Sequence, residues 1–95
     1  MKRSLVVTDD LRDLIRHLPP HLKGKIKQAL EEIVANPPLG KALRDELSGL
    51  HSYRIGDMRI VYQTDTNAVT LITIGPRKTV YQKAALELKR QASKE

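Results

Sequence analysis

The chain has 95 residues, with 17 Lys and Arg against 11 Asp and Glu, and therefore carries a net charge of +6. That length predicts one small domain over residues 1–95, and the basic balance favours a polyanion or an acidic partner protein, although basic surfaces are also common in small proteins. There is no cysteine and the three histidines are scattered, which argues against a metal site, so we expect no metal or other cofactor.

The N-terminal half predicts a strand followed by two helices. Residues 4–8 are a short β-branched run, as expected for a strand. Apolar residues recur with helical spacing over residues 11–18, and Pro19 ends that helix. A second apolar stripe over residues 22–34 predicts a longer helix, which begins near Pro20. The two helices are expected to form a hairpin.

The C-terminal half predicts an antiparallel meander. Residues 41–47 read as a short helical turn, and strands follow at residues 50–55, 58–64 and 69–74. A short C-terminal helix follows, which we expect to fray from residue 89. The fold class is therefore α+β, with the N-terminal strand and helical hairpin packed on a three- to four-stranded antiparallel sheet. Two helices can cover one sheet face, which leaves the other partly open.

The most informative feature is a hairpin that turns at Gly56-Asp57. Glycine accepts the positive φ of a two-residue turn, and pairing around this turn sets Arg54 opposite Arg59. Like charges directly opposite on a sheet destabilise it, and a bound anion such as phosphate would relieve the repulsion. Each arginine alone reads as a solvated strand residue, but the opposed pair favours a binding role. Apolar residues fill the alternate positions, so the pair is expected on the open face.

We therefore hypothesise that the catalytic residues are Arg54, Arg59, Arg77 and Tyr81. Arginine grips phosphate oxygens at two points, and preplaced arginines would stabilise the charge that develops when a ribose 2′-OH attacks its own 3′-phosphate. That reaction uses no metal. Tyr81 would stack on a base or protonate the leaving oxygen. The alternative readings are a core anchor for Tyr81 and simple loop charges for Arg77 and Lys78.

The groups that transfer protons are harder to assign. Lys41 and His51 are the nearby candidates for the base, and both are weak. His51 faces Tyr62 and is expected to pack against it. The remaining cations expected to contact RNA are Lys41, Arg44 and Lys78.

Over most of its length the chain resembles the RelE/ParE superfamily of type II toxins, especially the RelE-type ribosome-dependent mRNA endonucleases. The resemblance rests on residues 43–50, 52–62 and 74–81. It implies a RelE-like fold, with Arg59 as the phosphate-stabilising arginine and Arg77 as the arginine after the third hairpin strand. Tyr81 corresponds to the tyrosine that stacks on substrate, and Arg54 to a basic strand position.

The chain departs from that pattern at the proton-transfer positions. Gly56 stands where RelE has a second lysine, and Pro76 stands where many relatives have a histidine. Lys41 lies near the position at which some relatives use a carboxylate base. The arginine pair, Arg54 and Arg59, which we call the phosphate clamp, is therefore expected to be present. Activity is expected to be weak or to depend on groups supplied by the ribosome.

The resemblance also implies partners and alternatives. The expected partners are a cognate antitoxin, in a toxin–antitoxin hetero-oligomer, and mRNA on the ribosome. With no secretory signal and no long apolar run, we expect a cytoplasmic protein without a membrane partner. The alternative is a non-catalytic binder, either a ParE-type DNA gyrase inhibitor or a degenerate toxin that mainly binds its antitoxin. A basic RNA-binding module is a third reading. The motif of Arg77 and Tyr81 favours the nuclease.

Overall fold

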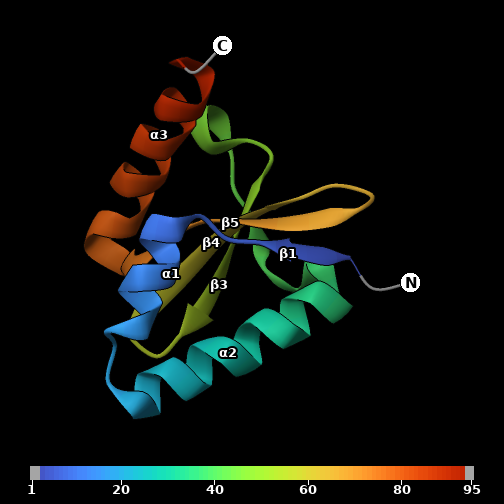
Figure 1. Cartoon of the computed structure of the whole chain (residues 1–95). Coiled ribbons are helices and arrows are strands. Elements are labelled where there is room, and N and C mark those ends of the chain that lie inside the picture. The colour runs from blue at the N-terminus through green and yellow to red at the C-terminus, as the bar shows by residue number, and fades with distance from the viewer. Residues whose placement is uncertain (1–2, 94–95) are drawn as a thin grey trace.

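A five-stranded mixed sheet with helices on both faces forms the part of the chain, residues 3–93, that the computed structural model describes (Figure 1). The elements in chain order are β1 (Ser4–Val6), α1 (Asp9–Arg16), α2 (Pro20–Ala35), the 3-10 turn η1 (Pro37–Leu39), β2 (Lys41–Ala42), the 3-10 turn η2 (Asp45–Leu47), β3 (Leu50–Ile55), β4 (Met58–Thr64), β5 (Ala68–Pro76) and α3 (Arg77–Ser93). Within these residues, no helix combines the length and apolarity needed to cross a membrane.

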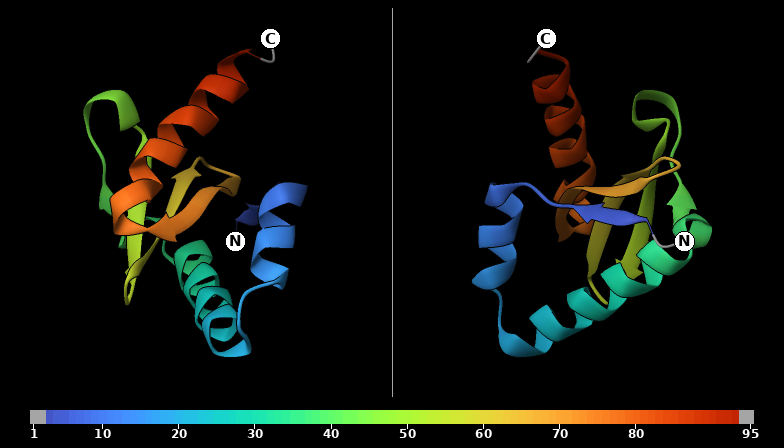
Figure 2. Two further views of the ribbon diagram at one scale, coloured as in Figure 1. Left: turned by 90° about the vertical axis from the view of Figure 1, so that its left-hand side faces the viewer. Right: turned by 45° about the vertical axis from the view of Figure 1, so that its right-hand side comes forward.

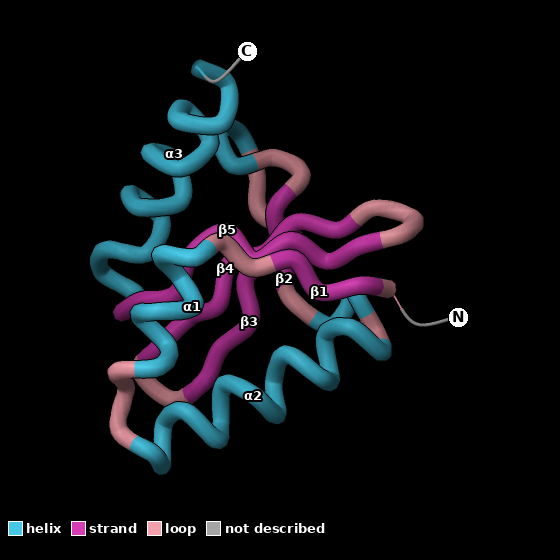
Figure 3. Tube along the Cα trace, viewed as in Figure 1, coloured by secondary structure: helices cyan, strands magenta, loops and turns pink. Residues whose placement is uncertain are grey.

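The strand order is β1-β5-β4-β3-β2. Figure 3 draws the strands in magenta and the helices in cyan. The α+β class and the antiparallel meander of β3, β4 and β5 are confirmed. The predicted sheet of three to four antiparallel strands was incomplete in two respects. β1 joins β5 in parallel, and Lys41–Ala42 forms an edge strand against β3 instead of the predicted helical turn. Only Asp45–Leu47 of that segment is helical, as a single 3-10 turn.

Local signals set the boundaries of the first two helices. Thr8 caps α1, since its hydroxyl accepts a hydrogen bond from the Leu11 N–H at 3.3 Å. α2 begins at Pro20, where a missing N–H costs nothing, and it ends before Pro37. α1 has no buried residue, and the two helices point away from each other on either side of the loop that joins them (Figure 2). The predicted hairpin is therefore splayed rather than tightly packed.

Two apolar layers lie on opposite faces of the sheet. On the first, which we call the α2 face, Ile26, Ala29, Leu30 and Ile33 of α2 pack against Ile60, Tyr62, Val69, Leu71 and Ile74. On the second, the α3 face, Val80 and Ala84 pack against Leu50, Val61 and Ile72. The C-terminal helix has 17 residues and continues to Ser93, so it is neither short nor frayed at residue 89. α3 thus covers part of the face that the sequence predicts to be open.

Tyr62 links the chain before β2 to the sheet. Its ring is fully buried and its hydroxyl donates to the Pro37 carbonyl at 2.6 Å. The hydroxyl oxygen of Tyr62 in turn accepts a hydrogen bond from the Gly40 N–H at 2.8 Å. Burial raises the pKa of the Tyr62 phenol above its ordinary value. His51 stacks on this ring with centroids 5.3 Å apart, which confirms the predicted packing role. His51 therefore lies on the α2 face.

Gly40→Ala is expected to destabilise the protein by about 1–3 kcal/mol, because a Cβ there would meet the Tyr62 hydroxyl oxygen at 2.6 Å and the Ser52 carbonyl oxygen at 3.1 Å. The measurement is the free energy of unfolding in urea. The matched control is Gly24→Ala inside α2, where a Cβ meets nothing within 4 Å and helix propensity favours alanine by about 0.5–1 kcal/mol. Equal stability of the two variants would contradict this packing.

Candidate functional site: a cationic phosphate clamp

The strand register places two rows of residues on the α3 face. Directly opposite residues of paired strands point to the same face, as do residues two apart in one strand. The predicted opposition of Arg54 and Arg59 is confirmed, and Lys41 lies opposite Ser52. The rows are Arg54, Arg59 and Gly75 in one and Lys41, Ser52 and Val61 in the other.

The hairpin turn holds the two arginines in place and leaves their charge uncompensated. Gly56 has a φ of 56°, and Asp57 does not share the positive φ, as in a turn of type II′. Arg54 Nε donates to the Gly56 carbonyl at 3.2 Å, and Arg59 Nη1 donates to the Met58 carbonyl at 3.5 Å. Across residues 3–93, neither guanidinium forms an ion pair with a carboxylate. The pair is therefore available for an anionic ligand.

The start of α3 adds further positive potential. Gly75 pairs with Arg59 and Pro76 with Met58, so Arg77 follows directly beside the hairpin. The first turn of α3 contains no acidic residue. The exposed N–H groups at a helix N-terminus carry a partial positive charge, which adds to that of the arginines.

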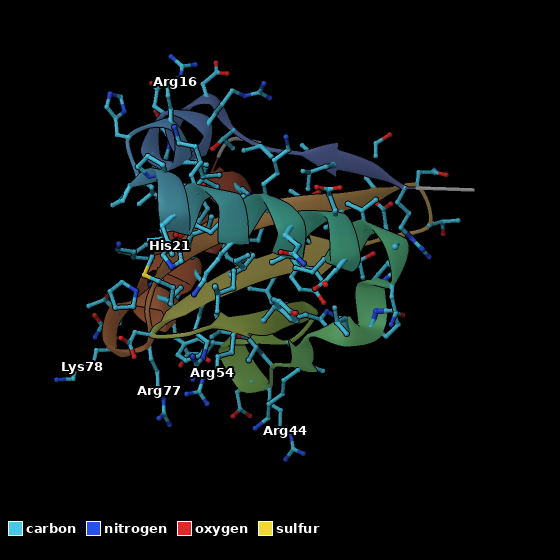
Figure 4. All side chains as sticks on the ribbon, turned by 90° about the horizontal axis from the view of Figure 1, so that it is seen from below. Arg16, His21, Arg44, Arg54, Arg77 and Lys78 are labelled. Carbon is cyan, nitrogen blue, oxygen red and sulfur yellow. The ribbon has the colours of Figure 1, made fainter. Side chains whose placement is uncertain are left out.

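The labelled cations extend this site along one side of the molecule. In Figure 4, Arg44, Arg54 and Arg77 project to the same side, with Lys78 at the adjoining corner. Arg16 projects from the opposite side. Lys41 is exposed on the edge strand and shares the face of Ser52. The structure thus gathers all the cations predicted for the site, and it leaves His51 on the other face.

Tyr81 is anchored to the sheet at Ser52, which lies in the row next to that of Arg54 and Arg59. Its ring is partly buried against the apolar cluster beneath α3, and its hydroxyl shares a hydrogen bond of 3.2 Å with Ser52 Oγ. Ser52 precedes Arg54 by two residues on the same face, a separation of about 6.6 Å along the strand. The anchor role that the sequence allows for Tyr81 is therefore real, and it also fixes the ring next to the arginines.

Sequence reasoning missed the groups that surround Tyr81. Nothing in the local pattern indicates that Ser52 meets a tyrosine 29 positions later, or that Asp45 and Glu46 share a cavity with that ring. The one available signal was the alternation of β3, which places Ser52 on the face of Arg54.

Comparison with known proteins identifies the family. Residues 4–81 match the family described as the ParE toxin of type II toxin-antitoxin systems, parDE. The chain belongs to the RelE/ParE superfamily of type II toxins. It is 42% identical over 79 residues to Toxin RelE of Mycobacterium tuberculosis (strain ATCC 25618 / H37Rv), which covers 75% of this chain and 76% of that protein.

Solved structures of superfamily members share the fold of this toxin. The toxin–antitoxin complex RelBE2 of M. tuberculosis contains a chain with a TM-score of 0.70 and 27% identity, covering 81% of this chain and 100% of that chain. A mutant of the E. coli toxin RelE in the free state has a TM-score of 0.75 at 23% identity, covering 95% of this chain and 98% of the other. At that identity the E. coli protein supports the fold alone.

Proposed function

We propose that this toxin is a ribosome-dependent endonuclease that cleaves mRNA without a metal ion. The observation that carries the proposal is the row of Arg54 and Arg59, which have no carboxylate partner among the described residues and lie beside Arg77 and the N-terminus of α3. Such a row suits a phosphate whose negative charge increases during reaction. Lys41, Arg44 and Lys78 would contact the flanking phosphates.

The proposed reaction is an internal transfer at phosphorus. The ribose 2′-oxygen forms a bond to the adjacent phosphorus, the bond from phosphorus to the 5′-oxygen breaks, and the arginines stabilise the extra charge on the non-bridging oxygens. The 2′-OH proton passes to a base, and a proton is delivered to the leaving 5′-oxygen. Lys41, water and ribosomal groups are the proposed proton carriers, since His51 lies on the other face. Tyr81 is proposed to stack on a base.

We also infer a protein partner. The similar structures from M. tuberculosis and E. coli are those of toxin–antitoxin complexes. By this likeness we infer a cognate antitoxin that forms a hetero-oligomer with this toxin and neutralises its basic face in the cytoplasm. Release from the antitoxin would expose the clamp to mRNA.

The chemistry of cleavage provides the direct test. We expect cutting of mRNA on translating ribosomes to leave a 2′,3′-cyclic phosphate on the upstream fragment. Toxin and message are incubated with ribosomes, and fragment ends are identified by mass spectrometry. A message with a single 2′-O-methyl at the cut site should stay intact, while an identical message methylated several nucleotides away should be cut.

The role of metal is tested without ribosomes, because ribosomes themselves require magnesium and a chelator would inactivate them. At high toxin concentration we expect slow residual cutting of a short RNA, far below the rate on ribosomes and equal with or without a chelator. Cleavage of the 2′-O-methyl bond, or loss of all cutting in chelator, would contradict the mechanism.

The second candidate is the ParE-type gyrase inhibitor, and one observation favours it. The family that matches residues 4–81 bears the ParE name. A degenerate toxin is a related reading, supported by Gly56 and by the position of His51 on the α2 face. Both alternatives predict binding without RNA cleavage.

A further inference from the structure

The third place in the row of Arg54 and Arg59 belongs to a residue without a side chain. Gly75 of β5 pairs with Arg59 of β4, and it is buried. A Cβ at this position would meet Lys83 Nζ at 3.3 Å and Lys83 Cδ at 3.8 Å. The side chain of Lys83, from the second turn of α3, therefore lies over Gly75 and fills the space that a side chain of the strand would take.

This position brings the ammonium of Lys83 close to the phosphate clamp. The Cβ atoms of directly opposite residues in an antiparallel pair lie about 5 Å apart, so Lys83 Nζ lies within about 9 Å of the Cβ of Arg59. Side chains on a helix lean toward its N-terminus, and the N-terminus of α3 adjoins the β3–β4 hairpin. Lys83 thus adds a third positive charge at the β5 end of the row, one place beyond Arg59.

The carboxylates near Lys83 do not account for its position. Lys83 also lines a cavity of about 490 Å³ between α3 and the start of α1, and the carboxylates of this cavity are those of Asp9, Asp10 and Glu87. Glu87 pairs with Arg90 at 3.3 Å, and among the described residues no ion pair joins Lys83 to a carboxylate. A lysine that served the fold through its charge would contact one of these groups. The methylene stem of Lys83 packs on the sheet, and its ammonium is available to a ligand.

We propose that Lys83 binds the RNA phosphate next to the scissile one, on the β5 side of the phosphate clamp, in the place that Gly75 leaves open. The assignment rests on the proposed action on RNA, and it adds a substrate-binding residue to that site. An ammonium on a flexible stem contacts phosphate as a point charge, without the two-point geometry of arginine. Such a contact holds substrate and transition state alike, so it strengthens binding and leaves the rate of the bound complex unchanged.

Binding is measured with a short, fluorescently labelled 2′-O-methyl RNA that cannot be cut, by anisotropy over a range of salt concentrations. Lys83→Met removes the charge and keeps a stem that covers Gly75. We expect this variant to bind about three- to tenfold more weakly. The slope of log K against log salt concentration should decrease in magnitude by about 0.7, the value for one phosphate contact with a single strand. The urea midpoint of unfolding should stay that of the natural toxin.

The matched control is Lys27→Met. Lys27 is an exposed lysine of α2, the helix that packs on the other face of the sheet. This variant loses the same charge at a distance from the row. It should keep both the affinity and the salt dependence of the natural toxin.

A second pair of variants moves the charge from the helix to the strand. Gly75 does not have a positive φ, so its backbone accepts a side chain, and Lys83→Ala frees the space above it. Lys83→Ala alone should bind RNA as weakly as Lys83→Met. When Gly75→Lys is added to Lys83→Ala, we expect the affinity to return to within about twofold of that of the natural toxin, with the natural salt dependence. A side chain that only supported the fold could not be replaced in this way.

Cleavage kinetics separate this role from that of the clamp. On ribosome-bound mRNA, Lys83→Met should raise the toxin concentration that gives half the maximal rate by about three- to tenfold and leave the maximal rate unchanged. Arg59→Ala should instead lower the maximal rate, because Arg59 acts on the charge of the transition state.

The outcomes also distinguish Lys83 from the nuclease. Natural affinity and salt dependence in Lys83→Met overturn the assignment, and so does a folded double variant that does not recover binding. If the double variant does not fold, the salt dependence of Lys83→Met decides. If Lys83 behaves as expected in binding while ribosome-bound mRNA stays whole, the phosphate contact stands and the nuclease falls. If mRNA is cut and Lys83→Met binds like the natural toxin, the nuclease stands and the role of Lys83 falls.

Discussion

Arg59→Ala is expected to lower the rate of mRNA cleavage by roughly 100- to 1000-fold, and growth inhibition should disappear when the toxin is expressed without an antitoxin. A donor preplaced at a developing oxyanion contributes about 3–4 kcal/mol to the stability of the transition state. Arg59 is the half-buried member of the opposed pair and lies between Arg54 and Gly75 in its row. The rate is measured in single turnover on message programmed into ribosomes.

The same substitution should barely change stability. Removal of one of two opposed like charges relieves repulsion on the sheet, which offsets the loss of the packing of the Arg59 side chain. We therefore expect the free energy of unfolding to change by less than about 1 kcal/mol. Arg59→Lys keeps the charge without the planar fork and should recover only part of the rate.

The control for charge alone is Arg16→Ala. Arg16 is an exposed arginine that projects from the opposite side of the molecule and makes a surface ion pair of 3.7 Å with Asp13. This variant loses the same charge and should keep full activity. If Arg59→Ala keeps wild-type cleavage and melting behaviour, the clamp is not catalytic.

The features that local sequence predicts well are those that local physics determines. Alternation of apolar and polar residues about Gly56-Asp57 predicts the β3–β4 register and hence the opposition of Arg54 and Arg59. Prolines and a capping threonine set the helix boundaries near Thr8 and Pro20. These predictions need no information about distant parts of the chain.

The features that sequence did not predict depend on distant contacts. Lys41–Ala42 is too short for a strand pattern and is extended only because β3 offers it an edge. The parallel pairing of β1 with β5 joins segments more than sixty residues apart. α3 covers the second face through Val80 and Ala84, whose spacing is that of any weakly amphipathic helix.

The candidate site likewise has features that local sequence predicts and features that depend on distant contacts. Arg54, Arg59 and Arg77 lie on β3, β4 and the start of α3, so strand alternation and the end of β5 were enough to predict their positions. Lys41 lies on β2 and Arg44 just before η2, in a segment whose extended edge strand the sequence did not predict. The surroundings of Tyr81 depend on the packing of η2 against α3, which no local pattern indicates. The hydroxyl of Tyr81 is bound to Ser52, which favours stacking over proton donation as its role.

Substitutions of Tyr81 are expected to separate the nuclease from the gyrase inhibitor. Tyr81→Phe loses the hydrogen bond to Ser52 and keeps the ring, so cleavage should fall only a few-fold. Tyr81→Leu keeps much of the apolar volume packed beneath α3 and loses the stacking surface. Because base stacking contributes about 1–3 kcal/mol, cleavage should fall roughly 5- to 150-fold in Tyr81→Leu.

A gyrase inhibitor would give the opposite pattern with the same proteins. It would block supercoiling of relaxed plasmid by purified gyrase and leave mRNA on stalled ribosomes intact. The comparison needs both assays at one toxin concentration, with unfolding curves to show that each variant is folded. If the natural toxin inhibits gyrase while ribosome-bound mRNA stays whole, the nuclease is wrong. The catalytic roles of Arg59, Arg77 and Tyr81 would then fall with it, because no phosphate would gain charge at the clamp.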